Sequence, residues 1–257
     1  MATEPLYSML LRPGSLSVLF QPIVAAQDGL AVRFVEALTR GPRGTNLEAA
    51  DVLFEYARRK GKAAELDRVC TRQALAAAAA LPAGIGVSLN VHASTLDQDG
   101  DFAPFLAGLA AENRRPAADV VVEIVEHAPR WAGPKFYQAL AALRREGMRV
   151  ALDDIGSGNS TYRMMLDCNP EYFKIDRYLV NGCYADARRR AVLQSLCGLA
   201  RTFGALVVAE GVETGEDLAT VCSLGFDFAQ GFLLAEPQPI GEIARRLRDD
   251  APRLREE

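Results

Sequence analysis

Short apolar runs that each end in a carboxylate recur along this chain and constrain its fold more than any other feature. The runs are residues 34–35, 120–122, 150–152 and 205–209, and they are followed by Glu36, Glu123, Asp153 and Glu210. Runs of this length, bounded by glycine and polar residues, are typical of buried strands. An acid at the end of a buried strand is costly unless a positive charge compensates it. The simplest compensation is a divalent metal ion or a pair of such ions.

Strand and helix patterns alternate through about eight units, which at this length predicts a parallel sheet closed into a (β/α)8 barrel. Strands are expected at residues 17–24, 32–39, 86–91, 120–124, 149–153, 172–175, 206–209 and 226–229. Helices are expected at residues 47–60, 63–81, 102–113, 135–146, 186–203, 216–224 and 241–248, with a short one from Ser160. The turn at residues 27–29 joins the first two strands as a hairpin, so we expect a modified TIM-like barrel with an antiparallel first strand.

We expect a single barrel domain over residues 13–249, with an N-terminal lead at 1–12 and a polar C-terminal tail at 250–257. In barrels of this kind the active site lies at the C-terminal ends of the strands. Each acid named above is predicted to lie there, which favours a functional over a purely structural interpretation.

The composition argues against several functions. A net charge of −4 disfavours binding of a nucleic-acid polymer, whose backbone is recognised by a basic stripe. The five cysteines are scattered and form no CxxC pair, which indicates a reducing cytoplasm and not a disulfide framework or a zinc site. No basic segment followed by an apolar run opens the chain, and proline and glycine interrupt its longest uncharged stretch, residues 73–96. We expect a cytoplasmic protein without a membrane span.

Oxygen donors dominate the polar residues near the predicted strand ends. The chain contains no HExxH zinc motif, no GxSxG elbow and no GxxxxGK phosphate loop. Oxygen-only sites suit Mg²⁺ or Mn²⁺. Adjacent Asp153 and Asp154 are expected to point in different directions on an extended backbone, and so to hold two ions or bridge between them. Lys174, at the end of its own strand, supplies a fixed positive charge for a nucleophile or a phosphate.

Eight short motifs follow one another in a fixed order along the chain. They are QPIV at 21–24, EALTR at 36–40, LNV at 89–91, EIVE at 123–126, LDDIGSG at 152–158, KID at 174–176, AEGVE at 209–213 and QGF at 230–232. Together they resemble the EAL-domain phosphodiesterases, which hydrolyse cyclic di-GMP to linear pGpG. The resemblance covers about residues 18–237, nearly the whole chain. Any one motif is weak, but the ordered series is a specific match.

This resemblance implies roles for individual residues. The implied metal ligands are Glu36, Asn90, Glu123, Asp153 and Asp154, the last shared between two ions. The implied catalytic residues are Lys174, which helps to position the attacking water, Glu210, a ligand or general base, and Gln230, which steadies the water or the metal shell. Gln21 and Arg40 are implied to contact the dinucleotide, and Glu126 and Glu213 to support the loop after Asp154.

The resemblance also implies cofactors and partners. Two Mg²⁺ or Mn²⁺ ions are expected to support turnover, whereas Ca²⁺ is expected to bind and inhibit. The expected partners are cyclic di-GMP, a second copy of the chain in a homodimer, and a fused or separate sensor domain.

The chain departs from the family pattern at three places. Val125 replaces a common threonine, Ile155 replaces a usual phenylalanine, and residues 159–162 replace a usual Tyr-Ser-Ser-Leu. The second and third departures touch the loop that transmits dimerisation to the active site in this family. The implied metal ligands are all retained.

Two functions are alternatives to hydrolysis of cyclic di-GMP. One is a catalytically weak EAL-type receptor, which is distinguished by loss of the metal ligands or the lysine; this chain has lost neither. The other is a barrel glycosidase with paired carboxylates, against which Asn90, Lys174 and an aromatic content of only 7% argue. Individual residues also have structural interpretations: Asn90 and Gln230 as turn formers, and Glu213 with Thr214 and Asp217 as the start of a capped helix.

Overall fold

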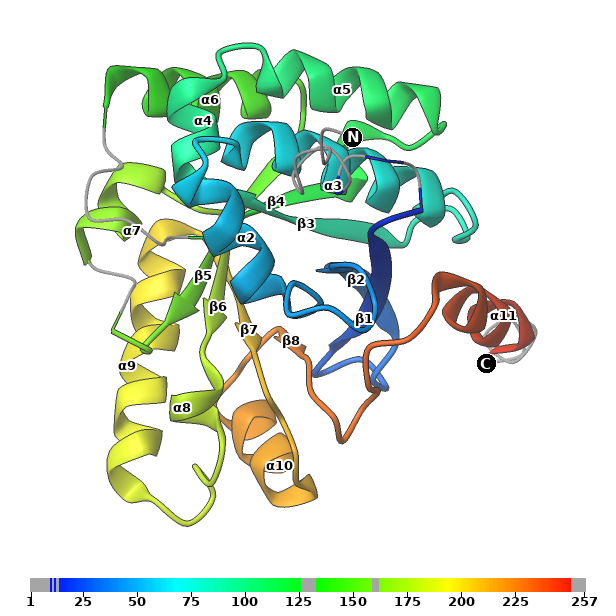
Figure 1. The fold of residues 1–257 in the computed structure, drawn as a ribbon. Coiled ribbons are helices and arrows are strands. Elements are labelled where there is room, and N and C mark those ends of the chain that lie inside the picture. Colours follow the sequence, from blue (N-terminus) through cyan, green and yellow to red (C-terminus); the bar gives the residue numbers. More distant parts are fainter. Residues whose placement is uncertain (1–9, 11, 13, 126–132, 159–161, 251–257) are drawn as a thin grey trace, which may run out of the picture.

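The computed structural model describes residues 10, 12, 14–125, 133–158 and 162–250. Within these residues, eight strands form a closed barrel in chain order, with helices around its outside (Figure 1). The strands are β1 (Ser17–Ala25), β2 (Val32–Arg40), β3 (Gly86–His92), β4 (Val120–Val125), β5 (Arg149–Ile155), β6 (Tyr172–Ile175), β7 (Leu206–Ala209) and β8 (Phe228–Ala229). Each predicted strand overlaps an observed one, and the predicted barrel is confirmed.

β1 is the strand that departs from the parallel arrangement. It runs antiparallel to both neighbours, β2 and β8, whereas the other neighbouring pairs of the described barrel are parallel. The β1–β2 register pairs Ser17 with Arg40 and Gln21 with Glu36. The predicted hairpin and antiparallel first strand are therefore confirmed. This register also places Gln21, in the middle of β1, beside an acid of the candidate site.

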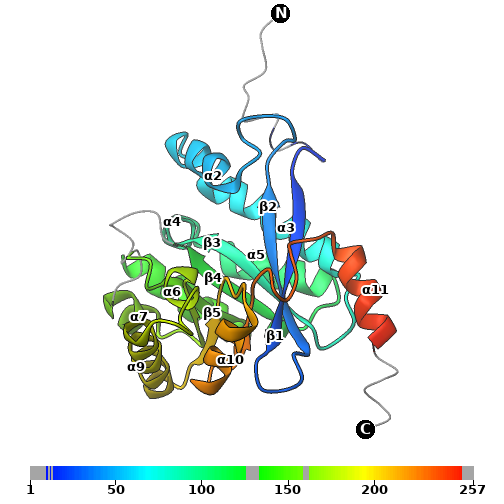
Figure 2. The same cartoon turned by 90° about the horizontal axis from the view of Figure 1, so that it is seen from below.

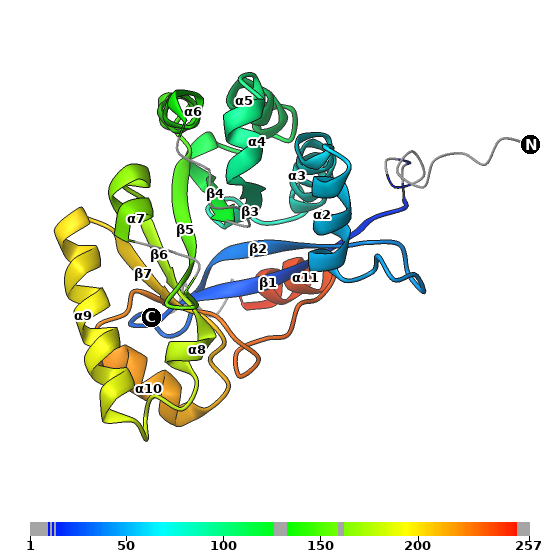
Figure 3. The ribbon, with the colours of Figure 1, turned by 60° about the vertical axis from the view of Figure 1, so that its left-hand side comes forward.

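The helices pack against the outer surface of the barrel. They are α2 (Ala50–Arg59), α3 (Ala63–Ala78), α4 (Ala93–Gln98), α5 (Phe102–Glu112), α6 (Pro134–Arg145), α7 (Tyr162–Cys168), α8 (Arg177–Val180), α9 (Ala187–Phe203), α10 (Gly215–Ser223) and α11 (Ile240–Asp250), with a 3-10 turn at Ala117–Asp119. The C-terminal helix α11 packs beside β1, so the last helix of the fold contacts its first strand (Figures 2 and 3). None of the described helices combines the length and apolar character that a bilayer crossing requires.

Several predicted boundaries were wrong by a few residues. The helix predicted from residue 47 begins at Ala50, because Glu48 N donates to Thr45 O and closes a turn first. The helix predicted to reach residue 81 ends at Ala78, just before Pro82, and the last strand is shorter than expected. The short helices α4 and α8 were not predicted, because six and four residues are too few to show a helical period.

Apolar side chains also close the lower part of the barrel interior. Phe34, Tyr172 and Phe228 lie at or near the start of their strands and meet edge to face, with ring centroids of Phe34 5.5 and 5.4 Å from the other two. Ile23 and Val208 pack with them. Because this layer excludes water from the base of the barrel, polar side chains inside it are confined to the opposite end, where the parallel strands finish.

Gly231 allows the loops after β7 and β8 to approach closely. Val212 N donates to Gln230 O at 3.0 Å, and Leu233 N donates to Val212 O at 3.1 Å. A Cβ atom at residue 231 would lie 2.2 Å from both the nitrogen and the oxygen of Val212. Only glycine fits this contact without a backbone shift, so the contact holds Gln230 in position at the mouth of the barrel.

We predict that Gly231→Ala lowers the free energy of unfolding by about 1–3 kcal/mol, the usual cost of overpacking a filled site. Urea denaturation measures the change. The control is Gly198→Ala in α9, where an added Cβ meets no atom within 4 Å. That change should instead stabilise the protein by up to about 1 kcal/mol through helix propensity. Equal stability of Gly231→Ala and the parent would contradict the close approach.

Candidate active site

A break in the sheet register positions the two adjacent aspartates of β5. Between Leu152 and Ile155, β5 has one residue more than the facing segment of β6, and Asp154 has a φ of 55°. Aspartate is one of the residues that tolerate this left-handed conformation, and the extra residue forms a β-bulge. The prediction of an extended backbone here, with Asp153 and Asp154 pointing apart, was therefore wrong. One carboxylate oxygen from each aspartate and one from Glu210 lie within 4.8 Å of one another.

Lys174 of β6 is buried in the middle of a group of carboxylates. Its Nζ lies 2.7 Å from Glu123 Oε2, 2.7 Å from Glu210 Oε1, 3.1 Å from Asp153 Oδ1 and 3.3 Å from Glu36 Oε2. The lysine side chain is only 2% exposed, so these acids and not water compensate its charge. The carboxylates come from β2, β4, β5 and the residue after β7. Closure of the barrel therefore brings together residues that lie far apart in the sequence.

Two of these acids lie deeper in the barrel than predicted. β2 continues for four residues beyond Glu36, and β4 continues for two beyond Glu123. The prediction that both acids stand at strand exits was therefore wrong; their side chains point into the upper barrel interior. Each strand continues past its acid because the later residues still pair with a neighbouring strand: Leu38 pairs with Leu19 of β1, and Val125 pairs with His92 of β3.

Amide side chains complete the environment of Glu36. Asn90 Nδ2 donates to Glu36 Oε1 at 2.9 Å, and Gln230 Nε2 donates to Glu36 Oε2 at 2.7 Å. Gln230 Nε2 also lies 2.9 Å from Gln21 Oε1. The remaining amide oxygen, Gln230 Oε1, is buried and has no hydrogen-bond partner among the described residues. A buried oxygen of this kind, beside several carboxylates, fits a cation or a water bound to one.

The cluster carries more negative than positive charge. Burial, helped by the charge of Glu36, raises the pKa of Glu123 to about 8. Burial and the neighbouring Asp153 raise the pKa of Asp154 to about 6, and burial also raises the pKa of Glu210 well above its ordinary value. Without a bound cation the site therefore binds protons. Its hard oxygen donors fit a divalent cation such as Mg²⁺ or Mn²⁺, which would displace those protons.

The two groups at the centre of the cluster are held in their charged forms. Burial lowers the pKa of Lys174, but the surrounding carboxylates, Asp153 first, raise it well above its usual range. Burial raises the pKa of Glu36, but Lys174 and the amides of Asn90 and Gln230 outweigh that effect and lower it. Lys174 therefore stays an ammonium group, and Glu36 stays a carboxylate, at neutral pH.

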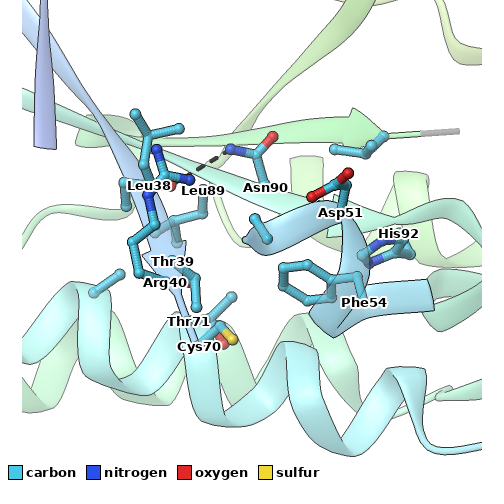
Figure 4. Close-up of a pocket in the computed structure, with 14 residues that line it drawn as sticks. Leu38, Thr39, Arg40, Asp51, Phe54, Cys70, Thr71, Leu89, Asn90 and His92 are labelled. Atoms are coloured by element: carbon cyan, nitrogen blue, oxygen red, sulfur yellow. Dashed lines mark hydrogen bonds between the residues drawn. The ribbon is translucent and has the colours of Figure 1, made fainter. Parts of the chain in front are cut away.

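Two pockets flank the cluster. The first has a volume of about 200 Å³, and its lining comes from β2, β3, α2, α3 and the end of β4 (Figure 4); it includes Arg40, Asp51, Phe54, Asn90 and His92. The second has a volume of about 320 Å³ and includes Gln21, Glu36, Asp154, Glu210, Gln230 and the exposed Phe232. Asn90 lines the first pocket and donates to Glu36 of the second. The hydrogen bond between Asn90 and Glu36 therefore links the two pockets.

Buried aspartates outside the cluster support the elements that carry it. Asp67 of α3 accepts hydrogen bonds from His92 N at 3.0 Å and from Thr95 Oγ1 at 2.6 Å, and it contacts His92 Nδ1 at 3.0 Å. This network fixes the end of β3 and holds the His92 ring in place. Asp217 accepts from the backbone nitrogens of Gly182 and Tyr184, which fixes the segment after β6.

The residues predicted to support the loop after Asp154, and those at which the chain differs from the family pattern, lie in different surroundings. Glu213 is exposed and lines the second pocket, and the predicted helix cap beside it is confirmed, because Thr214 Oγ1 accepts from Asp217 N at 3.1 Å. Val125 lines the first pocket, and Ile155 is fully buried in the core. Glu126 and residues 159–161 lie outside the described residues.

Ser88 contacts a residue of the cluster and was not predicted from the sequence. Its Oγ donates to Glu123 Oε1 inside the barrel. Ser88 lies two residues before Asn90 on β3, so the alternation of side chains along a strand places both on the same face. That spacing was the signal by which Ser88 could have been found.

Comparison with known proteins identifies similar sequences. The EAL domain family matches residues 6–237. A probable cyclic di-GMP phosphodiesterase of Escherichia coli, PdeG, is 29% identical over 240 residues, which cover 91% of this chain and 47% of PdeG. The cyclic di-GMP phosphodiesterase RocR of Pseudomonas aeruginosa is 33% identical over 155 residues, which cover 60% of this chain and 39% of RocR. The aligned regions thus span less than half the length of these relatives.

Solved structures share the fold. Klebsiella pneumoniae BlrP1 in complex with manganese and cyclic di-GMP aligns with a TM-score of 0.79 at 28% identity, over 90% of this chain and 58% of that one. The EAL enzyme Bd1971 bound to cAMP and cyclic di-GMP aligns with a TM-score of 0.82 over 93% of this chain and 66% of that one. At 22% identity, the second likeness concerns the fold alone.

We predict that the metal-free protein becomes less stable as the pH rises from about 5 to about 8. The pKa of Glu123 is about 8 in the folded state, against an ordinary value of 4.5. The folded state therefore binds more protons than the unfolded state in this window, and removing those protons favours unfolding. Thermal unfolding in EDTA at several pH values measures the effect. The unfolding midpoint of Glu123→Gln should fall less steeply with pH than that of the parent. A parent midpoint that rises with pH would contradict the raised pKa of Glu123.

Proposed function

The chain belongs to the EAL domain family, and on that premise we propose that it is a metal-dependent phosphodiesterase that hydrolyses cyclic di-GMP to linear pGpG. The observation that carries the proposal is the group of carboxylates that meet around Lys174 at the mouth of the barrel. The similarity to proteins named cyclic di-GMP phosphodiesterases, and to BlrP1 in its complex with manganese and cyclic di-GMP, supports the same reaction and ligand.

Two divalent cations, Mg²⁺ or Mn²⁺, suit the charge of the site. Five carboxylates less one ammonium group leave four negative charges, which two such ions neutralise. The residues that would hold them are Glu36, Asn90, Glu123, Asp153 and Asp154, with Glu210 within reach of the last two. Bound ions of this kind activate a water and stabilise the leaving oxygen of a phosphodiester. The bulge at Asp154 supports the sharing of that residue, since it turns both aspartates toward the same space.

The remaining polar residues of the cluster would orient the water and accept its proton. Lys174 helps to hold Glu36 in its ionised form and provides a fixed positive charge toward an attacking oxygen. Burial raises the pKa of Glu210, so its ionised form is a stronger base than an exposed glutamate and suits a proton acceptor. Gln230 would steady the water through its Oε1, which has no hydrogen-bond partner within the described part of the chain.

The two pockets suit a ligand with two bases joined by phosphodiesters. A cyclic dinucleotide centred on the carboxylates would direct one base toward each pocket. Arg40 in the first pocket and Gln21 in the second are the side chains that we propose to contact it. A catalytically weak receptor remains the alternative function. The smaller Ile155 in place of phenylalanine favours that alternative, whereas the complete set of ligands and the lysine favour the enzyme.

We further propose a cytoplasmic homodimer under the control of a sensor region. The exposed side chains of Tyr162, Leu166 and Tyr178 on α7 and α8 support a surface for self-association beside the segments that carry Asp154 and Lys174. The greater length of the relatives supports a sensor region. The five free cysteines support a reducing compartment.

We expect the purified protein to convert cyclic di-GMP to pGpG in Mg²⁺ or Mn²⁺, as chromatographic separation of the products will measure. Ca²⁺ should occupy the site but support little turnover, because its larger and looser coordination shell misplaces the water. EDTA should abolish the reaction. Full activity in EDTA, or equal activity in Ca²⁺, would contradict the metal mechanism. Tight binding of cyclic di-GMP without any pGpG, with metal bound, would establish the receptor.

Glu210→Gln should reduce turnover by at least about 100-fold, the scale on which positioned acid–base groups act. The substitution keeps the size of the side chain but removes a charge that contacts Lys174 at 2.7 Å. Steady-state kinetics and equilibrium binding of cyclic di-GMP separate the loss of chemistry from a loss of affinity. The control is Glu216→Gln, an exposed acid in the first turn of α10, which should turn over at the parent rate. Parent-like turnover by Glu210→Gln would refute the role.

A further inference from the structure

The two oxygens of the Glu123 carboxylate have different partners. Oε2 lies 2.7 Å from Lys174 Nζ, on the side of the metal-binding cluster. Oε1 accepts a hydrogen bond from the hydroxyl of Ser88. Glu123 is 1% exposed and Ser88 is 2% exposed, so bulk water does not reach either partner. The carboxylate is therefore held by Lys174 at one oxygen and by Ser88 at the other.

The barrel interior below Glu123 supplies little to replace that hydroxyl. Ser88, Glu123 and Lys174 line a cavity of about 10 Å³ together with apolar side chains such as Ile23 and Val208. The other hydroxyl of this cavity, that of Tyr172, receives a hydrogen bond from Arg149 Nη1 at 2.8 Å. Without Ser88, Oε1 would face an apolar wall, and an unpaired buried oxygen is unfavourable.

β3 offers a hydrogen bond to each of two neighbouring acids. In the sheet register Ser88 lies beside Glu36, and Asn90 lies beside Glu123. The bonds run diagonally to this pairing: Asn90 donates to Glu36 at 2.9 Å, and Ser88 donates to Glu123. One strand therefore orients acids on both of its neighbours through side chains two residues apart.

We propose that Ser88 is a positioning residue that orients Glu123 for a divalent cation, an inference that rests on the function proposed above. Its hydroxyl fixes Oε1 inside the barrel and leaves Oε2 turned toward the cluster. Partners of this kind set the orientation of a metal ligand, and their loss typically lowers metal affinity by about 10–100-fold.

Binding of Mn²⁺ to the whole metal-free chain tests the inference, followed by calorimetry or by the electron paramagnetic resonance signal of free Mn²⁺. Ser88→Ala should weaken binding by about 10–100-fold. Ser88→Thr keeps the hydroxyl and should restore affinity close to that of the parent. The matched control is Tyr172→Phe, which removes the other hydroxyl of the same cavity, one that pairs with Arg149 Nη1 at 2.8 Å. It should lower the unfolding temperature without changing Mn²⁺ affinity.

Parent-like Mn²⁺ affinity in Ser88→Ala would overturn the inference, as would an equal loss in Tyr172→Phe. If Ser88→Ala does not fold, Ser88→Cys takes its place, because a thiol has a similar shape but is a weak donor. Parent-like affinity in that variant would overturn the inference in the same way. A parent that binds no Mn²⁺ would overturn both the proposed function and this inference, whereas parent-like binding by Ser88→Ala overturns the inference alone.

Discussion

The contacts between Lys174 and the carboxylates around it are the interaction on which the rest of the site depends. An ammonium group buried to this degree is tolerated only when opposite charges surround it, and buried acids need the same compensation. The barrel meets both needs at once, because each partner comes from a different strand and closure brings them to one point. The aromatic layer below keeps water away from the lower side of this charged group. The single ammonium group of Lys174 nevertheless cannot balance the charge of five acids, and this excess of negative charge favours the binding of metal ions.

Unusual backbone features are concentrated where the site needs side chains in exceptional positions. Asp154 adopts a left-handed conformation at a bulge, and Gly231 packs directly against the backbone of Val212. Each feature fixes a group at the mouth of the barrel. Left-handed residues other than glycine, such as Asp154, are common in functional sites, where the surrounding structure holds them in place.

The regular part of the fold could be predicted from the sequence because the spacing of apolar and polar residues over short stretches indicates strands and helices. The apolar runs of the strands and the hairpin turn at residues 27–29 indicated the barrel and its antiparallel first strand. The acids, the amides and Lys174 could be named because motifs mark them. The bulge at Asp154 could not be predicted, because it depends on the register between β5 and the next strand, β6, which no local pattern specifies. The bond from Ser88 to Glu123 joins two strands through a residue that no motif includes, and the supports from Asp67 and Asp217 are similarly long-range.

The antiparallel direction of β1 has a consequence for how the barrel connects to the rest of a larger protein. Ser17, where β1 begins, pairs with Arg40, the last residue of β2 and part of the lining of one pocket. A polypeptide joined ahead of β1 would therefore approach the rim that carries the candidate site, instead of the closed aromatic base. In a barrel with eight parallel strands the same segment would arrive at the opposite end. A domain placed ahead of β1 would thus act on the mouth of the barrel directly, without a change in the barrel core.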